Sequence, residues 1–357
     1  MQPTDFPEAN QAISFEDESW RNLGLILNQK NPSKLFVLVD RNTKEHCLSS
    51  LQAALSAFKK EAIVLEVEAG EKSKDISVCG YLWNELTSHQ ADRYALLINL
   101  GGGMVTDLGG FVAAIYKRGI AFINIPTSLL GMIDASIGGK CGIDFKHYKN
   151  QLGVFQTALS TLIYTDFLET VPQIELNSGF AEAIKHALIE DSAYWNQLKT
   201  ADQQAWKARG VIKNSVEIKT AIVSRDPLEK GERKKLNFGH TLGHALESYF
   251  FEKNKPIPHG YAIASGIIME VYISMKQLGF SQTQFEEVTN FIKSHYTIYT
   301  LSDVAADELL TYMSQDKKNS GGEVRFCLLK SIGHAIVDQV VDIELIKESI
   351  SFYRKLK

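Results

Sequence analysis

The feature that most constrains the fold is an alternation of short apolar runs with amphipathic stretches in the first half of the chain. The apolar runs have the length of buried strands, and the stretches between them repeat apolar residues at helical spacing. This alternation is typical of a parallel sheet covered by helices. The sequence predicts strands at 34–40, 62–67, 94–100 and 121–125, and helices at 45–60 and 76–89.

Helical periods dominate after about Pro172. The predicted helices are 175–189, 202–225, 236–251, 262–278, 281–295 and 305–314. We therefore predict two domains: an α/β domain with a Rossmann-like parallel sheet over residues 1–172, and a mostly α-helical domain over residues 173–357.

Composition excludes several classes of partner. The 357 residues carry 38 Lys plus Arg and 42 Asp plus Glu, and a net charge of -4 is too balanced to indicate a nucleic-acid or membrane-surface partner. The four scattered cysteines form no CxxC pair, which argues against a disulfide framework and a thiolate zinc site. No uncharged apolar run approaches roughly 18 residues, and the N-terminus lacks an apolar leader. We expect a cytoplasmic protein.

A glycine-rich turn follows the third predicted strand. Gly101 to Gly103 lead into Asp107 and a second glycine pair before an apolar helix. Such glycines let backbone N–H groups approach a phosphate at a helix N-terminus, which favours a dinucleotide ligand. Because the order is GGGxxxD and not GxGxxG, a plain tight turn is the alternative. Asp40, at the end of the first strand, could accept hydrogen bonds from a ribose, but an aspartate there is more often a turn residue or a helix cap.

Asn237, His240 and His244 recur at spacings of three and four residues, which would place them on one helix face. Two imidazoles four residues apart are a recurrent way to hold zinc. Because no cysteine lies nearby, a carboxylate and a third imidazole must complete such a site, and Glu182 and His259 are the candidates. For a single histidine a packing role is the simpler interpretation, whereas the pair favours a metal.

Glu182 and Lys185 share a helix face among apolar neighbours. A solvated ion pair is the alternative, but these neighbours predict a pair that is at least partly buried and that needs a metal or substrate partner.

Other cations gather in three segments. The stretch 138–142, followed by Lys149 and Asn150, is interpreted as a flexible loop that brings cations and an amide to a phosphate or carboxylate. The basic runs at 225–235 and 316–319, each taken alone, are interpreted as solvated faces.

Six motifs, read together, resemble the 3-dehydroquinate synthase family of sugar phosphate cyclases. They are GGGMVTDLGGF (101–111), KRGIAFINIPTSLLGMIDASIGGKCGID (117–144), KNQLGVF (149–155), GFAEAIKHALI (179–189), RKKLNFGHTLGHALE (233–247) and PHGYA (258–262). The resemblance spans about residues 34–330. Iron-dependent alcohol and glycerol dehydrogenases share the GGGxxxD turn but lack the GGK, KN and NxGH elements.

The resemblance implies a homodimer with NAD on the N-terminal domain and a divalent metal, zinc or alternatively cobalt, on the helical domain. It implies a lyase that converts the sugar phosphate 3-deoxy-D-arabino-heptulosonate 7-phosphate to 3-dehydroquinate and phosphate, in the shikimate pathway of aromatic amino acid biosynthesis. The implied metal ligands are Glu182, His240 and His259. His244 would then face substrate and not bind the metal, unlike in the HxxxH interpretation.

The resemblance also assigns two larger sets of residues. The implied cofactor contacts are Asp40, Asn42, Glu71, Lys74, Gly101, Gly102, Gly103, Asp107, Thr127, Ser128, Asp134, Lys140, Lys149, Phe167 and Thr170. The implied substrate and catalytic residues are Lys140, Asn150, Lys185, Lys219, Arg233, Asn237, His244, one of Lys317 or Lys318, and Arg118 of the partner subunit. Ser128, Cys141 and His186-Ala187 depart from the usual residues of the family, and none of them removes an implied ligand.

Three hypotheses remain open at this point. The first is the cyclase, within which relatives acting on sedoheptulose 7-phosphate or glucose 6-phosphate share most motifs. The second is a metal-dependent polyol dehydrogenase, which would produce NADH stoichiometrically and release no phosphate. The third is a noncatalytic nucleotide-binding module, which the intact set of implied ligands disfavours.

Overall fold

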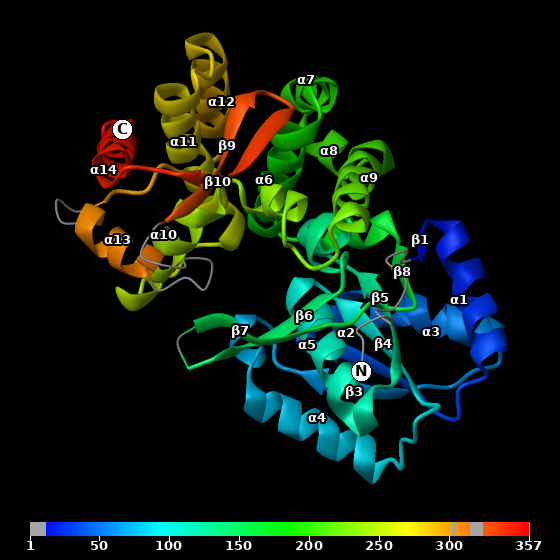
Figure 1. Ribbon diagram of the computed structural model, residues 1–357. Helices are drawn as coiled ribbons and strands as arrows, with labels where there is room; N and C mark the ends of the chain where they lie inside the picture. Colours follow the sequence, from blue (N-terminus) through cyan, green and yellow to red (C-terminus); the bar gives the residue numbers. More distant parts are fainter. Residues whose placement is uncertain (1–11, 147, 302–304, 315–323, 357) are drawn as a thin grey trace. The chain divides into compact units, whose positions relative to one another are not determined.

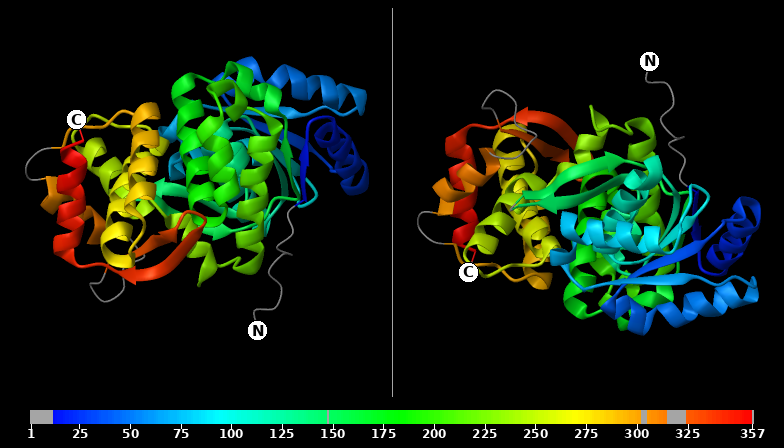
Figure 2. Two further views of the ribbon diagram at one scale, coloured as in Figure 1. Left: turned by 90° about the horizontal axis from the view of Figure 1, so that it is seen from above. Right: turned by 90° about the horizontal axis from the view of Figure 1, so that it is seen from below.

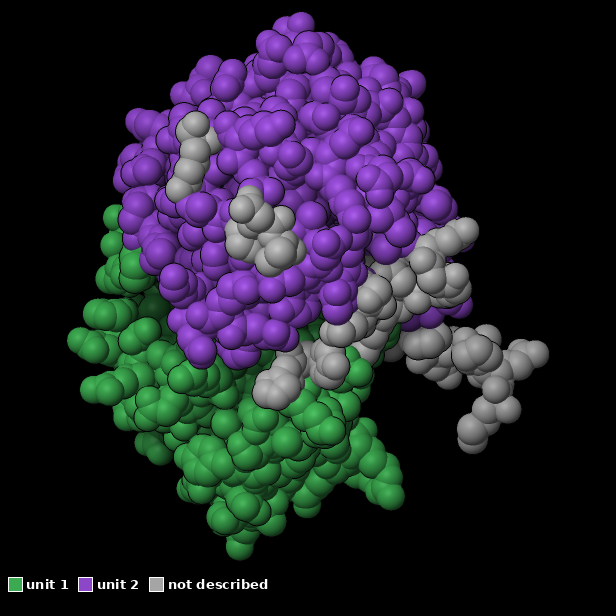
Figure 3. Space-filling view, turned by 90° about the vertical axis from the view of Figure 1, so that its left-hand side faces the viewer, with its two compact units in different colours: residues 1–172, 207–216 green, residues 173–206, 217–357 purple. Residues whose placement is uncertain are grey.

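The computed structural model describes residues 12–146, 148–301, 305–314 and 324–356 (Figure 1). The chain divides into two compact units, coloured separately in Figure 3. Unit 1 comprises Met1–Pro172 and Lys207–Val216, and unit 2 comprises Gln173–Trp206 and Glu217–Lys357. Unit 2 begins at Gln173, and residues 207–216 group with unit 1.

Unit 1 is built on a six-stranded sheet in the order β1-β8-β5-β4-β2-β3. Its strands are β1 (Ala12–Phe15), β2 (Leu35–Asp40), β3 (Ile63–Val67), β4 (Leu96–Gly101), β5 (Ala121–Pro126) and β8 (Ser160–Ile163). Every described pairing in this sheet is parallel. Strands β2 and β4 are buried almost throughout, which explains their continuous apolar sequence. The predicted parallel α/β class is confirmed.

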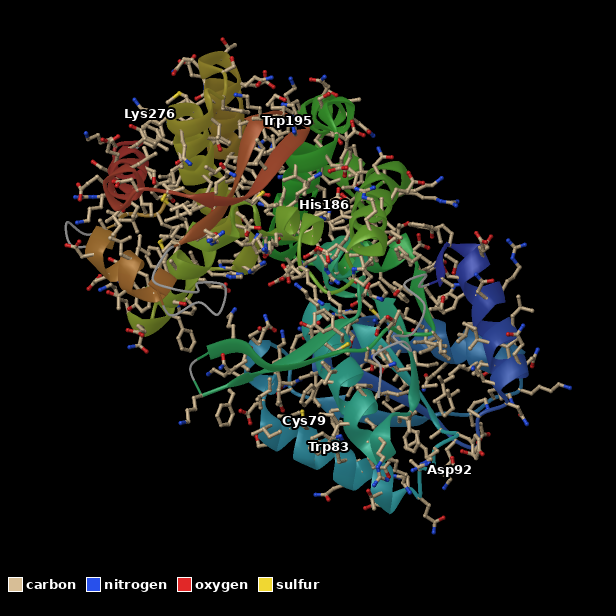
Figure 4. All side chains as sticks on the ribbon, viewed as in Figure 1. Cys79, Trp83, Asp92, His186, Trp195 and Lys276 are labelled. Carbon is tan, nitrogen blue, oxygen red and sulfur yellow. The ribbon has the colours of Figure 1, made fainter. Side chains whose placement is uncertain are left out.

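The helices that accompany the sheet are α1 (Asp17–Lys30), α2 (Arg41–His46), α3 (Leu48–Ala57), α4 (Ile76–Ser88) and α5 (Gly103–Ile115). The predicted helix 45–60 is wrong in detail, because Cys47 leaves helical geometry and separates α2 from α3. Cys79 and Trp83 project from α4 (Figure 4). Cys79 is buried in the core, and the Trp83 Nε1 donates to the Val112 carbonyl of α5 at 3.2 Å.

The segment interpreted as a flexible loop is an antiparallel hairpin. Strand β6 (Lys140–Phe145) pairs with β7 (Tyr148–Phe155), and β6 packs against α5. The loop prediction was wrong because it relied on the glycines and lysines of this segment and overlooked the apolar residues between them, which form a buried face. Cys141 and Ile143 belong to the hydrophobic core of unit 1, which anchors the hairpin.

Unit 2 is mostly helical, as predicted. Its helices are α6 (Gln173–Glu190), α7 (Ser192–Thr200), α8 (Gln203–Trp206), the second half of α9 (Arg209–Arg225), α10 (His240–Glu252), α11 (His259–Leu278), α12 (Gln282–His295), α13 (Ala305–Ser314) and α14 (Ile343–Arg354). Helix α11 is central, since it packs against α6, α10, α12 and α14. The red helix α14 lies beside it in both views of Figure 2.

Three features of unit 2 differ from the prediction. The stretch 202–225 forms two helices, α8 and α9. Helix α10 starts at His240, after a separate 3-10 helix, η5 (Glu232–Asn237). An antiparallel hairpin of β9 (Arg325–Ser331) and β10 (His334–Val340) was not predicted.

Two expectations about the whole chain can be compared with the structure. All four cysteines are free and buried, in agreement with the absence of a disulfide framework. Within the described residues, no helix has both the length and the apolarity needed to cross a membrane.

Candidate active site

Helix α6 carries a buried pair of opposite charges. Glu182 and Lys185 are 0% and 1% exposed, and the Lys185 ammonium forms an ion pair with Glu182 Oε2. Residues 176–189 of this helix are buried throughout, so neither charge reaches bulk water. The predicted burial is confirmed, and it is costly enough that each charge needs an opposite charge beside it.

Two imidazoles meet the other oxygen of Glu182. His240 and His259 are the first residues of α10 and α11. The Nε2 atoms of His240 and His259 lie 3.5 Å and 3.4 Å from Glu182 Oε1. The three potential ligand atoms lie within 4.8 Å of one another. Packing of α10 and α6 against α11 thus brings together three side chains that are far apart in the sequence.

The outer ring nitrogens of these histidines also have acceptors. His240 Nδ1 lies 3.0 Å from the Phe238 carbonyl, and His259 Nδ1 lies 3.4 Å from Glu247 Oε2. Acceptors at Nδ1 favour the tautomer whose Nε2 can bind a metal, and they orient the ring. One carboxylate and two imidazoles are a ligand set found at catalytic zinc ions, where an open position remains for water or substrate. These residues therefore fit a divalent ion.

The environment of His259 is strongly negative. Burial alone lowers the pKa of this imidazole, but hydrogen bonds to Glu182 and Glu247 outweigh burial and raise the pKa to about 10. Two carboxylates around one imidazole indicate a place where additional positive charge is favourable.

His244 lies beside His240 and His259 but does not belong to the set of potential ligands formed by Glu182, His240 and His259. Its ring centroid lies 5.1 Å from that of His240 and 5.9 Å from that of His259. His244, Glu247 and His259 form a second set whose ligand atoms lie within 4.8 Å of one another. His259 belongs to both sets, so the geometry leaves His244 two possible roles, as a metal ligand or as a neighbour of bound substrate.

Asn237 does not lie on the face of α10, so this part of the prediction was wrong. Gly239 adopts the left-handed conformation (φ 79°) and separates η5 from α10. The Asn237 Nδ2 instead donates to Glu229 Oε1 at 2.7 Å. Glu229 was missed, because nothing in the sequence marks a lone loop carboxylate as a partner of Asn237.

The basic run 225–235 is not a uniformly solvated face. Arg233 is 2% exposed and donates from Nη1 to the Pro227 carbonyl at 2.6 Å. Its neighbours Lys234 and Lys235 are less buried and form ion pairs with Asp338 and Glu190. Lys219 of α9 is also buried. The predicted substrate residues Lys317 and Lys318 lie outside the described residues.

Unit 1 brings several of the predicted cofactor residues to one edge of its sheet. Asp40 ends β2, Gly101 ends β4, Thr127 follows β5, and Phe167 lies in the short 3-10 helix that follows β8. Because the strands are parallel, their carboxyl ends meet at one edge. The chain order reverses between β2 and β4, and such a switch point is where open α/β sheets form a ligand crevice.

The glycine turn lies at this switch point. Gly102 precedes α5, which has no side-chain cap at its N-terminus. A Cβ atom on Gly102 would lie 3.1 Å from Ser128 Oγ, so the turn leaves little room for a side chain. Asp40 acts as a helix cap: its Oδ1 accepts from Thr43 N at 2.8 Å, and Thr43 Oγ1 accepts from Asp40 N at 3.0 Å.

A buried lysine of unit 1 forms hydrogen bonds with two other predicted site residues. Lys74 Nζ lies 2.7 Å from Asp107 Oδ2 and 2.6 Å from Asn150 Oδ1. Burial alone lowers the pKa of Lys74, but Asp107 and Glu71 outweigh it and hold the pKa above its usual value. The Lys149 ammonium lies 3.9 Å from Glu71 Oε1.

The remaining predicted residues of unit 1 lie in short elements. Asn42 lies in α2 and Lys140 begins β6; Arg118, Asp134 and Thr170 lie in the single-turn or short helices η2 (Tyr116–Arg118), η3 (Gly131–Ala135) and η4 (Thr165–Thr170).

Comparison with known proteins places the chain in a family. Residues 64–178 match the family described as 3-dehydroquinate synthase N-terminal, and residues 179–319 match its C-terminal counterpart. The chain belongs to the 3-dehydroquinate synthase family. The C-terminal match contains Glu182, His240 and His259, and the N-terminal match contains the glycine turn.

Relatives from distant organisms support this membership. The chain is 43% identical over 325 residues to the 3-dehydroquinate synthase of Parabacteroides distasonis, which covers 90% of this chain and 92% of that protein. It is 37% identical over 336 residues to that of Pyrococcus furiosus, with 92% and 95% covered.

A solved structure shares the fold of this chain. The 2-epi-5-epi-valiolone synthase of Streptomyces hygroscopicus subsp. jinggangensis, solved with NAD+ and Zn2+ bound, superposes with a TM-score of 0.87. The match covers 100% of both chains at 22% sequence identity. At this identity the match supports the fold and does not identify the substrate. His186, which follows Lys185 in the sequence, is buried on α6 (Figure 4).

Proposed function

We propose that this protein is a 3-dehydroquinate synthase, which converts 3-deoxy-D-arabino-heptulosonate 7-phosphate to 3-dehydroquinate and phosphate. The observation that carries the proposal is the convergence of Glu182, His240 and His259 in a chain of this family. The proposal includes a divalent metal, zinc or cobalt, held by these three residues, and NAD held at the switch point of unit 1.

When bound, the metal would polarise substrate hydroxyls, and NAD+ would accept a hydride and later return it. Glu182 offers Oε1 on the side of the two imidazoles while Lys185 holds Oε2. This arrangement orients the carboxylate. The Phe238 carbonyl and Glu247 orient the two imidazoles in the same way.

The chemistry of the substrate accounts for the buried cations of unit 2. A sugar acid phosphate carries a carboxylate and a phosphate, and buried Lys and Arg side chains suit such anions. Lys185, Lys219 and Arg233 are buried cations of this kind. We assign them, with Asn237 and His244, to substrate binding and orientation, and we assign Lys140 and Asn150 of unit 1 to the same task.

We also propose that the protein is a cytoplasmic homodimer in which Arg118 of the partner subunit contributes to each substrate site. Light scattering on the purified protein tests the dimer. An Arg118→Ala variant that stays dimeric should lose substrate affinity, and unchanged affinity would contradict the contribution of this arginine.

Phosphate release tests the reaction directly. The purified protein is incubated with 3-deoxy-D-arabino-heptulosonate 7-phosphate, NAD+ and zinc, while phosphate and the absorbance of NADH are followed together. Many turnovers of phosphate without net NADH are expected, because the hydride is returned. NADH accumulating without phosphate would indicate a polyol dehydrogenase instead. If neither product forms, other sugar phosphates become the substrates to test.

A further inference from the structure

Helix α10 begins without a cap from its own segment. The first N–H groups of a helix have no carbonyl partner within the helix and are usually satisfied by a nearby side chain. The residue before α10 is Gly239, which has no side chain to offer. Glu270 of α11 takes this role: its Oε2 accepts from Gly239 N at 2.7 Å, and its Oε1 accepts from Leu242 N at 3.2 Å.

Glu270 is 0% exposed, so its charge lies entirely within the protein. A carboxylate is stabilised at a helix N-terminus, where two backbone N–H groups and the positive end of the helix dipole face it. Both of its oxygens are used on the start of α10. Burying a carboxylate costs free energy. Because the proposed reaction assigns no role to Glu270, we look for a structural reason for its burial.

The two helices approach each other closely along one stripe of α11. Ala262, Gly266 and Glu270 are spaced by four residues and so share a helix face. A Cβ atom on Gly266 would collide with the Gly239 carbonyl oxygen. One turn along α10, a Cβ atom on Gly243 would lie 3.1 Å from the Ala262 carbonyl oxygen. Glu270 ends this stripe and fastens the start of α10 to it.

This contact bears on the candidate metal ligands. His240 is the first residue of α10 and lies between the two residues whose N–H groups Glu270 accepts. His259 is the first residue of α11, the helix that carries Glu270. A shift of α10 along α11 would therefore move His240 away from His259 and Glu182.

We propose that Glu270 is a positioning residue that fixes the register of α10 on α11 and so holds His240 in the metal-binding set. The inference rests on the proposed metal site, and it adds a residue outside the set of ligands.

The first test is Glu270→Gln, which keeps the shape of the side chain. The amide has one acceptor oxygen and one NH2 group, so one of the two backbone N–H groups of α10 would face a donor. We expect Co2+ affinity to fall about 10- to 100-fold, the usual cost of losing an outer-shell partner. We also expect a changed visible absorption spectrum of bound Co2+, since His240 would be displaced.

Ser274→Ala is the matched control. Ser274 lies one turn further along α11, where its hydroxyl accepts from Leu329 N at 3.0 Å and donates to the Glu270 carbonyl at 2.7 Å. Its loss should destabilise α11 without changing α10. Glu270→Asp is a second variant, which keeps the charge and both acceptors and should bind Co2+ more tightly than Glu270→Gln. Glu270→Gln binding Co2+ like Ser274→Ala, with the wild-type spectrum, would overturn the proposal.

Hydrogen exchange separates this inference from the metal site itself. In the metal-free protein, the amides of residues 239–242 should exchange faster in Glu270→Gln than in Ser274→Ala. Equal exchange would contradict the cap.

If wild-type Co2+ binding survives His240→Ala, the proposed metal site is wrong and the effect of Glu270 on metal binding fails with it. If His240→Ala abolishes binding but Glu270→Gln changes nothing, only the role of Glu270 fails.

Discussion

The two units hold their candidate site residues by different means. In unit 2, Glu182, His240 and His259 come from three long helices, two of which begin at a histidine. In unit 1, the residues assigned to the cofactor come from strand ends, the start of helix α5, short helices and a hairpin, and Lys74 joins Asp107 to Asn150. Helix packing positions the first group, whereas side-chain hydrogen bonds position much of the second.

This difference has consequences for mutation. A ligand set that is built by helix packing around a buried carboxylate should tolerate little change in charge, because loss of a partner leaves a buried charge insufficiently compensated. A set held by polar links between short elements should weaken locally, with smaller effects on stability.

Removing one ligand of the helical set should have the largest effect. His240→Ala should abolish metal binding and activity together. His244→Ala, its matched control on the same helix, should reduce turnover but keep the metal. Metal content after dialysis, measured with the rate of phosphate release, checks both variants. If both are metal-free, His244 is a ligand, and the second set with Glu247 and His259 must be reconsidered.

Lys185→Met should have the next largest effect, on stability. It leaves Glu182 buried without its ion-pair partner, which costs about 3–5 kcal/mol. Bound zinc supplies positive charge to the same carboxylate, so the loss should be smaller in the zinc-loaded protein. Urea unfolding with zinc and with chelator measures both values. An equal loss in the two conditions would mean that the metal does not act on Glu182.

Lys74→Met should act mainly on the cofactor. It removes charge-assisted hydrogen bonds to Asp107 and Asn150, each worth about 1.5–3 kcal/mol, so we expect NAD+ affinity to fall by about one to two orders of magnitude. Zinc affinity should not change. Lys72→Met is the control, because Lys72 is exposed in the same short segment. Titration calorimetry with NAD+ and with zinc separates the two affinities, and a loss of zinc affinity would contradict the separation.

The sequence predicted the elements that depend on periodic apolar residues. Strands β2 to β5 and most helices of unit 2 follow from alternation and helical spacing. The hairpin β6–β7 was missed, because the apolar residues that pack on the core, Cys141, Ile143, Leu152 and Val154, are separated by glycines and charged or polar residues. The start of α10 was also missed, because the break depends on the left-handed Gly239 and on Glu270, which is 31 residues away in sequence.

The candidate site shows the same division. Spacing alone brought His240 and His244 to attention, and burial of Glu182 and Lys185 followed from their apolar neighbours. Glu182 and His259 were candidates because a zinc site without cysteine needs a carboxylate and a further imidazole, whereas the exclusion of His244 from the ligands came from the family resemblance. The partners that orient them, such as Glu247 and the Phe238 carbonyl, depend on tertiary packing and have no local sequence signal.

Substitution of Asp40 has the smallest expected effect and is the most specific test, since this residue has both a structural role and an expected role in cofactor binding. Its side chain caps α2 through Thr43 N. Asn is as good a cap as Asp, so Asp40→Asn should leave stability within about 0.5 kcal/mol, whereas Asp40→Ala should cost about 1 kcal/mol. If Asp40 also accepts from the ribose, both variants should bind NAD+ more weakly. Thermal unfolding and NAD+ titration measure the two effects separately. An Asp40→Asn variant with unchanged stability and unchanged NAD+ affinity would show that the aspartate is only a cap.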